Sequence, residues 1–169
     1  MNLSIFHQQI SPIRSKLYRF ALRITGSVHE AEDVVQDVFE KVWKVTDEHA
    51  ETVQNWEAWC MTLTRNRSID KTRSRSFRRA APLETTFDHA SPAASPAQTA
   101  ELGDTVAHVR KLMQELPEKQ RLVMHLRDIE EMSYDEIAQT LDITLDQVKV
   151  NLHRARKAVR GWLLGLDEA

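Results

Sequence analysis

The sequence predicts an all-α protein of two small helical domains joined by a flexible linker. Glycine is rare, at 4 of 169 residues, and β-branched runs are short, so the composition favours helix. Apolar residues recur at helical spacing in both halves of the chain. That spacing is lost between residues 81 and 101, a run rich in alanine and proline without lysine or arginine. We therefore place the domains at residues 1–80 and 102–165, with the linker at 81–101.

The first predicted helix begins at Ser11 and Pro12, an N-cap serine followed by proline in the first turn. It ends at Gly26 in the left-handed conformation. A second helix follows at once, over about residues 28–45, with Ser27 and Glu30 as a capping box. The expected buried face of these helices consists of Ile13, Leu17, Phe20, Ala21 and Ile24, then Ala31, Val34, Val35, Val38, Val42 and Val45.

The opposite face of the second helix is acidic, and aromatic residues flank its buried face. Its polar residues are Asp33, Gln36, Asp37 and Glu40. Aromatic side chains beside such a face are typical of a protein interface. The alternative is that Phe39 and Trp43 only complete the core.

A third helix is predicted from residue 56 to about 77, after a polar loop at 46–54, with Asn55 as its cap. Its inward residues are Trp56, Trp59, Cys60 and Leu63. Asn66 and Asp70 continue this stripe, so they either form hydrogen bonds inside the domain or line a polar pocket. The outer face turns basic from Arg65 onward, and basic side chains beside tryptophans suit single-stranded or distorted DNA. The alternative is two core tryptophans and a solvated basic helix end.

The second domain is expected to hold four helices. The first has an apolar face and ends at Pro117. Pro117 also begins the next helix, which runs to about residue 127. A turn follows at 128–132. The apolar positions are Leu102, Val106, Val109, Leu112 and Leu116, then Leu122, Val123 and Leu126.

The last two helices, within residues 133–160, have the spacing of a helix-turn-helix. Each begins with a capping box, Ser133 with Glu136 and Thr144 with Gln147. The inner faces are Ile137, Ala138 and Leu141, then Val148, Leu152, Ala155 and Val159. The outward face of the second helix is basic, as in a recognition helix that enters the DNA major groove. The alternative is an αα-hairpin with a solvated basic face.

Charge and cysteine content limit the function further. The net charge is -2, but acids gather in residues 28–51 and bases in 65–79 and 149–160, which suggests one protein-facing surface and two DNA-facing surfaces. The single cysteine, Cys60, excludes an internal disulfide and a cysteine zinc cluster, and fits a cytoplasmic protein. No segment has the length of a membrane span or the pattern of a secretory signal. We expect no cofactor and no metal.

Four stretches together resemble the extracytoplasmic-function (ECF) class of bacterial RNA polymerase sigma factors, in the sigma-70 family. They are residues 31–43, 55–70, the proline-broken linker and 115–159, which cover nearly the whole chain in order. The resemblance implies a sigma region 2-like bundle and a region 4-like domain with a helix-turn-helix. It also implies three partners: core RNA polymerase, through its beta-prime clamp helices and beta flap, promoter DNA, and a separate anti-sigma factor.

The resemblance also implies roles for individual residues. The surface that binds core polymerase would consist of Asp33, Gln36, Asp37, Phe39 and Glu40. The surface that melts and reads the -10 element would consist of Trp56, Trp59, Arg65, Asn66, Arg67, Lys71 and Arg73, with a flipped base near Asn66 and the 46–54 loop. The residues that read the -35 element would be Thr144, Gln147, Lys149, Val150, Asn151, Arg154, Arg156 and Lys157. Asp142 stands where many members of the family have glycine.

The expected function is that of a non-enzymatic transcription initiation factor. An autonomous helix-turn-helix regulator is the alternative, although it would not need the first domain and would need a dimerisation segment. An enzyme is a distant third, since the sequence has no glycine-rich phosphate loop and its histidines are scattered.

Overall fold

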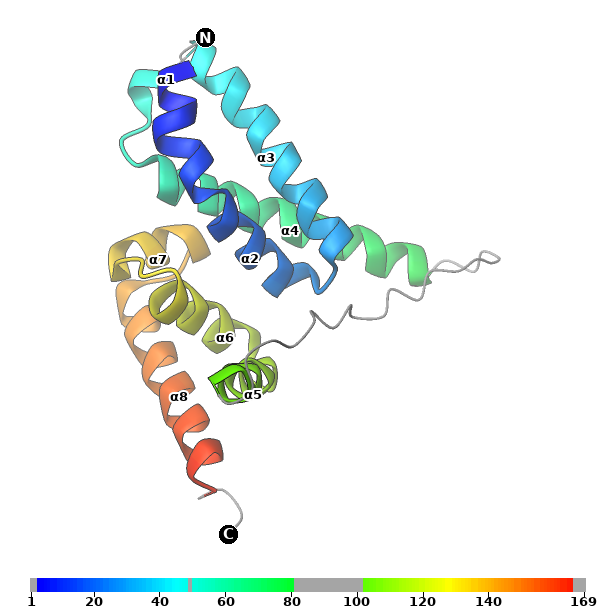
Figure 1. Cartoon of the computed structure of the whole chain (residues 1–169), viewed down its shortest axis with the longest axis vertical. Helices are drawn as coiled ribbons and strands as arrows, with labels where there is room; N and C mark the ends of the chain where they lie inside the picture. The colour runs from blue at the N-terminus through cyan, green and yellow to red at the C-terminus, as the bar shows by residue number, and fades with distance from the viewer. Residues whose placement is uncertain (1–2, 49, 81–101, 166–169) are drawn as a thin grey trace. The chain divides into compact units, whose positions relative to one another are not determined.

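The computed structural model of the chain describes residues 3–48, 50–80 and 102–165, and every regular element in these ranges is a helix. The described residues form two compact units, one before and one after residues 81–101 (Figure 1). The predicted linker, 81–101, lies outside the described residues. An all-helical protein was therefore correctly predicted. Within the described ranges, no helix is both long and apolar enough to span a bilayer.

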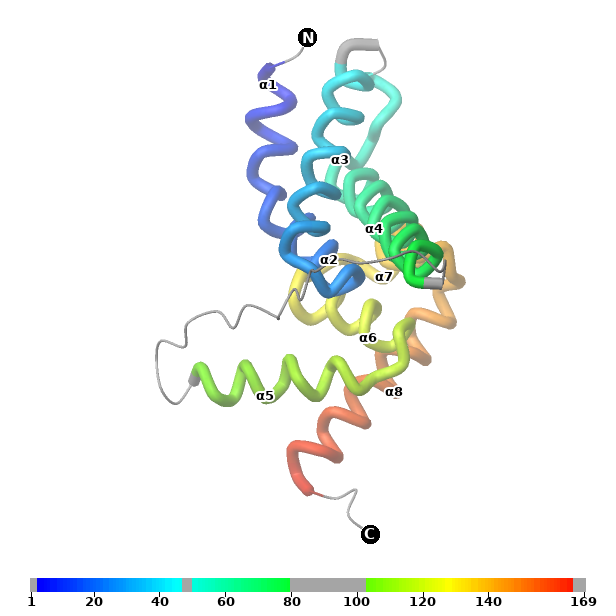
Figure 2. The backbone as a smooth tube through the Cα atoms, turned by 90° about the vertical axis from the view of Figure 1, so that its right-hand side faces the viewer, coloured from blue at the N-terminus to red at the C-terminus, as the bar shows by residue number. Residues whose placement is uncertain are grey.

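The first unit begins with one continuous helical path (Figure 2). It runs through α1 (Leu3–Ile5), the π-helical turn η1 (Phe6–Ile10), the 3-10 turn η2 (Ser11–Ile13) and α2 (Arg14–Thr25). The predicted helix start at Ser11 is therefore wrong, because Ser11 has helical dihedrals and donates its N–H to the carbonyl of Phe6. The predicted end is confirmed, since Gly26 caps α2 with φ 68°.

Helices α2, α3 (Val28–Glu48) and α4 (Trp56–Ala80) each contact the other two, and the short turn η3 (Ala50–Thr52) lies between α3 and α4. The cap at Asn55 is confirmed, since its Oδ1 accepts from Ala58 N at 3.0 Å. The core of this unit consists mainly of Leu17, Phe20, Ala21, Ala31, Val34, Val35, Val38, Val42, Cys60 and Met61. The stripe of α2 and α3 was thus predicted, apart from Ile24 and Val45, which are only half-buried.

Only half of the predicted capping box at α3 forms. Ser27 Oγ accepts from Glu30 N at 3.3 Å, as expected. The Glu30 carboxylate, however, pairs with Arg75 of α4, and Ser27 N donates to Thr25 Oγ1 at 3.4 Å. A tertiary ion pair has therefore replaced the local bond.

The second unit holds α5 (Leu102–Gln114), α6 (Glu118–Met124), the π-helical turn η4 (His125–Ile129), α7 (Tyr134–Leu141) and α8 (Leu145–Leu164). The predicted turn at 128–132 is wrong at its start, since the helical path extends to Ile129 and the tight turn is centred on Glu131, with φ 59°. The predicted apolar face of α5 is only partly buried: Val106 is exposed, and Val109 and Leu112 are half-buried. Leu116, just after the helix, is buried as predicted, and so is Met113, which was not predicted.

Burial confirms the predicted inner faces of α6 with η4, of α7 and of α8, except that Ala138 of α7 is only half-buried. Their buried apolar residues are Leu122, Val123, Met124, Leu126, Ile137, Leu141, Val148, Leu152, Ala155 and Val159. One buried polar pair lies among them: His125 Nε2 is 3.2 Å from Glu130 Oε1, and both side chains are almost fully buried.

Candidate protein and nucleic-acid interfaces

A ladder of three ion pairs joins α3 to α4. Arg67 Nε lies 2.6 Å from Asp37 Oδ2, and Lys71 Nζ lies 3.4 Å from Asp33 Oδ2. Arg75 Nη1 lies 3.1 Å from Glu30 Oε2. The acids stand about one turn apart on α3 and the bases one turn apart on α4, so two antiparallel helices place them in register. We call these three pairs the α3–α4 ladder.

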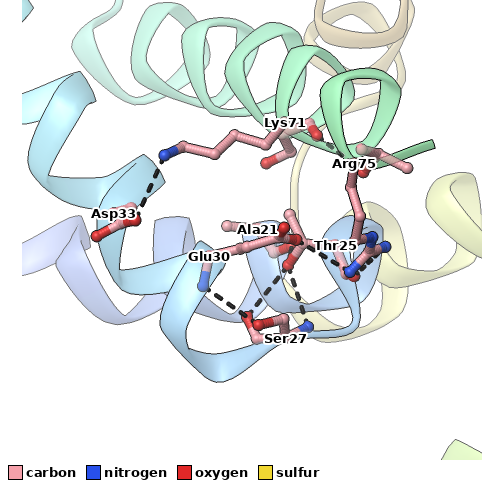
Figure 3. A network of polar contacts seen from close by, with 9 residues as sticks. Ala21, Thr25, Ser27, Glu30, Asp33, Lys71 and Arg75 are labelled. Carbon is pink, nitrogen blue, oxygen red and sulfur yellow. Dashed lines mark hydrogen bonds and ion pairs between the residues drawn. The ribbon is translucent and has the colours of Figure 1, made fainter. Parts of the chain in front are cut away.

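The ladder becomes more buried toward its Arg75 end. Arg75 makes a second bond, from Nη2 to the carbonyl oxygen of Thr25 at 3.0 Å, and this oxygen lies at the C-terminus of α2 (Figure 3). At the other end, the Arg67 and Asp37 side chains are 50% and 32% exposed. Partly exposed pairs of this kind contribute about 0–1 kcal/mol each.

The structure brings together residues that the sequence had assigned to separate surfaces. Asp33 and Asp37 were expected on a protein-facing acidic surface, and Arg67 and Lys71 on a DNA-facing basic surface. The structure pairs them with one another, so the two predicted surfaces meet at these four positions, and their roles toward polymerase and DNA stay a prediction. The sequence does hold the signal, an i, i+4 series of acids and another of bases, but not the helix crossing that joins them.

The rest of the predicted protein-facing stripe stays accessible. Gln36 and Glu40 are exposed, and Phe39 is half-buried in a groove between α2 and α3. Phe6 of η1 packs edge-on against both Phe39 and Trp43, with ring centroids 5.5 and 5.6 Å apart. The two aromatics are thus neither free nor buried in the core, and the segment that packs on them was not predictable from the local sequence pattern.

An open polar pocket of about 400 Å³ lies between α3 and α4 beside the ladder. Asn66 and Asp70 line it, and both are exposed. Of the two placements predicted for these residues, the polar pocket is therefore the observed one. Asn66 Oδ1 also accepts from Arg65 Nη1 at 3.3 Å. Carboxylates, lysines and an amide thus surround a space open to solvent.

The two tryptophans of α4 form one aromatic cluster. Their ring centroids are 5.6 Å apart at 90°, with Trp56 buried and Trp59 half-buried. Trp56 is therefore mainly a core residue, in agreement with the alternative that placed the tryptophans in the core. Arg73 lies exposed farther along the same helix.

The helix-turn-helix forms as predicted. Thr144 Oγ1 accepts from Gln147 N at 3.2 Å, and Gln147 Oε1 accepts from Thr144 N at 3.0 Å. Ser133 and Glu136 make the same pair of bonds at α7. Asp142 takes the left-handed conformation with φ 53° in the turn, a conformation that glycine adopts more readily than other residues.

The outward face of α8 is strongly basic. Lys149, Val150, Arg154 and Lys157 are exposed on it. Asn151 is half-buried, and its Nδ2 donates to the carbonyl of Gln147 at 2.7 Å. This bond uses one of the two N–H groups of the amide, so the second N–H and Oδ1 remain available to a ligand, while the backbone bond fixes the orientation of the side chain.

Arg156 differs from the other bases of α8. Its Nε donates to Asp128 Oδ2 at 3.1 Å, and its Nη2 donates to Asp128 Oδ1, which makes a bidentate pair. The hydrogen bond to Asp128 raises the pKa of Arg156. Together with Tyr134, Lys149 and His153, Arg156 lines a shallow basic groove beside α7. The sequence placed Arg156 on the outward face but gave no sign of its partner.

Comparison with known proteins covers both units. The model of sigma-70 region 2 matches residues 10–78, and the model of sigma-70 region 4 matches residues 108–159. The ECF RNA polymerase sigma factor SigE of Mycolicibacterium smegmatis is 32% identical over 155 residues, 88% of this chain and 57% of that protein's length. SigL of Mycobacterium tuberculosis, also an ECF RNA polymerase sigma factor, is 31% identical over 144 residues, 85% of this chain and 80% of SigL.

A solved structure is similar over nearly the whole chain. It is the sigma factor RpoE of Bartonella quintana in complex with the anti-sigma factor NepR, with a TM-score of 0.69, 26% identity and coverage of 96% of this chain and 98% of that one. Both family models, the relatives and this fold agree. The chain belongs to the ECF class of sigma-70-family RNA polymerase sigma factors, which are transcription initiation factors and not enzymes.

Proposed function

We propose that this chain binds core RNA polymerase and directs it to specific promoters, reading the -35 element as duplex and the -10 element as melted strand. The observation that carries the proposal is that one chain holds two different units. The C-terminal unit has a capped helix-turn-helix with an exposed basic helix, and the N-terminal unit pairs an acidic helix with a basic helix. An autonomous regulator would have no use for the N-terminal unit.

The polymerase-binding surface in this proposal is the outward stripe of α3. Gln36 and Glu40 are exposed there, and Phe39 lies half-buried beside them in the groove next to α2. Asp33 and Asp37 belong to the same stripe, although each also holds a cation of α4. An aromatic anchor within a polar rim is the usual anatomy of a protein interface. The beta-prime clamp helices are the proposed partner, and the beta flap is the proposed partner of the second unit.

The -10 surface in this proposal is the basic length of α4 with the pocket beside it. Extruding a base from the stack costs a few kcal/mol, which a preformed pocket and neutralised phosphates must offset. Asn66 would line that pocket, and Arg65, Arg67, Lys71 and Arg73 would neutralise the strand. Trp59 is the tryptophan with ring surface left for stacking, because Trp56 is almost fully buried.

The -35 surface in this proposal is α8. Lys149, Arg154 and Lys157 would contact phosphates, while Val150 and Asn151 face outward near the N-terminal end that enters the major groove first. Thr144 and Gln147 are committed to the capping box, so their side chains would act mainly by placing the helix start against the backbone. Arg156 would reach DNA only by leaving Asp128.

A separate anti-sigma factor is the proposed regulator. The support is the solved Bartonella quintana homologue, which was captured with one. The chain is proposed to act in the cytoplasm, where polymerase and promoter are found.

The test is a pull-down of the purified chain with bacterial core polymerase, beside a gel shift of the chain alone on promoter fragments. We expect core binding by the wild type and little binding of free DNA. Asp37→Arg should abolish core binding while the far-ultraviolet circular dichroism stays unchanged. Wild-type affinity in this variant would refute the α3 surface. Tight, specific DNA binding without polymerase would favour the autonomous regulator.

A further inference from the structure

The α3–α4 ladder gives the same side chains two competing roles. In the free chain Asp37 holds Arg67 at 2.6 Å, and Asp33 holds Lys71 at 3.4 Å. If the proposed function is correct, the two carboxylates belong to the polymerase surface and the two cations to the DNA surface. A carboxylate that is bound to a cation of a partner is less available to Arg67 or Lys71, and the reverse also holds.

We propose that these two ion pairs couple polymerase binding to DNA binding, an inference that rests on the proposed function. The free chain holds Arg67 and Lys71 on its own carboxylates and so competes with phosphate for them. A basic partner surface that takes Asp33 and Asp37 releases both cations for the DNA backbone. By linkage, DNA bound at Arg67 and Lys71 releases the carboxylates and strengthens partner binding by the same factor.

The third pair of the ladder is suited to a different role. Glu30 and Arg75 have side chains 22% and 34% exposed, less than the Asp37 and Arg67 side chains. Arg75 also bonds the carbonyl of Thr25 at the end of α2, so it ties α4 to both neighbouring helices (Figure 3). This pair keeps the two helices in register when the outer pairs open, and the release therefore requires side-chain movement only.

The expected size of the coupling is modest. Exposed ion pairs measured in other proteins correspond to ratios of about 1.5 to 5 in an equilibrium constant. Two such pairs multiply, so full release would raise the affinity for single-stranded DNA by about 2- to 25-fold at low salt. Salt weakens the pairs and the phosphate contacts alike, so the effect should be largest at low ionic strength.

The experiment compares Asp37→Asn with Glu32→Gln in the full chain without polymerase. Both substitutions remove one negative charge from α3 and keep the side-chain shape. Glu32 is exposed and makes no ion pair with the described residues, so it is the matched control. Binding of a labelled single-stranded oligonucleotide is followed by fluorescence anisotropy. We expect Asp37→Asn to tighten binding about threefold, and Glu32→Gln to change it far less.

Specificity for the pair is tested in an Arg67→Ala background. The gain from Asp37→Asn should disappear there, because the cation it releases is gone. Equal effects of the two neutral variants, no gain for Asp37→Asn, or a gain that persists without Arg67 would each overturn the proposal. Core polymerase binding by the wild type is measured in parallel. Its absence would refute the proposed function, whereas its presence without the Asp37→Asn gain would refute the coupling alone.

Discussion

At the scale of single residues, burial makes Cys60 an inert side chain. It is fully buried in α4, and burial raises the pKa of its thiol to about 12, with a smaller contribution from the Glu57 carboxylate. The thiolate is the reactive form, and almost none is present near pH 8. We expect a thiol reagent at pH 8 to label the native chain very slowly and the guanidinium-unfolded chain at once. Rapid labelling of the native chain would contradict the burial.

The same pKa has a consequence for stability at alkaline pH. The raised folded-state pKa means that the neutral thiol is favoured in the folded chain, so its contribution is complete below the ordinary value of 9.0. The contribution should decline as pH rises from 9 toward 12. In denaturation curves at these pH values, Cys60→Ala should lose less stability than the wild type over that interval.

Thr144 provides a second prediction at this scale. Its side chain satisfies Gln147 N, and its own N–H is satisfied by Gln147 Oε1. Loss of an N-cap typically costs about 1 kcal/mol. Thr144→Ala should therefore lower the free energy of unfolding of the second unit by about 1 kcal/mol, measured by chemical denaturation and circular dichroism. The exposed α7 substitution Gln139→Ala serves as control, and an equal loss there would contradict the capping assignment.

At the scale of elements, the outward side chains of α8 differ in how far they are already held by hydrogen bonds within the chain. Lys149 is exposed, whereas Asn151 already donates to the Gln147 carbonyl. In complex with polymerase, Lys149→Ala should weaken binding to all promoters alike and reduce the salt slope by about 1. Asn151→Ala should cost about 1–3 kcal/mol on the preferred -35 sequence and relax the preference, with little change in slope. Both are measured by promoter binding over a salt series.

The opposite pattern would require the roles of the two residues to be exchanged. If neither substitution affected promoter binding, α8 would not be the reading helix. Arg156→Ala offers a comparison on the same helix, because its guanidinium is tied to Asp128 and should contribute less to DNA affinity than Lys149 does.

Elements that depend on local chemistry were predictable from the sequence. The capping boxes at Ser133 and Thr144 and the glycine end at Gly26 need only neighbouring residues, and all three are observed. The π-helical turns η1 and η4 were not predictable, because each depends on packing beyond its own sequence. For the same reason the false start at Ser11 followed from a correct local rule, since the helical segment that precedes it makes a cap unnecessary.

The candidate sites divide along the same line. Which residues face outward on α8 followed from helical period and was predicted. Which residues pair across helices depends on a crossing that no local pattern encodes, so the α3–α4 ladder and the bond from Arg156 to Asp128 were missed. The cover of Phe6 over Phe39 and Trp43 is another contact of this kind.

At the scale of the whole molecule, the chain consists of two units with separate cores. The net charge of -2 gives little long-range attraction to DNA, so in the proposed function the affinity for DNA would come from the local basic faces of α4 and α8. Two weak sites on one chain then reinforce each other, because the first contact raises the effective concentration of the second. This explains how a near-neutral chain could select a promoter once polymerase fixes both units.

Additivity tests whether the two faces contribute independently. Arg73 lies exposed on α4 of the first unit, and Lys149 lies exposed on α8 of the second. Substitutions without shared partners usually add within about 0.5 kcal/mol. In complex with polymerase, Arg73→Ala and Lys149→Ala should therefore weaken promoter binding by factors that multiply in the double variant. On a fragment that carries only a melted -10 strand, Lys149→Ala should have no effect. The loss in the double variant could instead be no larger than in either single variant. That result would mean that one face binds only after the other, so that the two promoter contacts form in a fixed order and not independently.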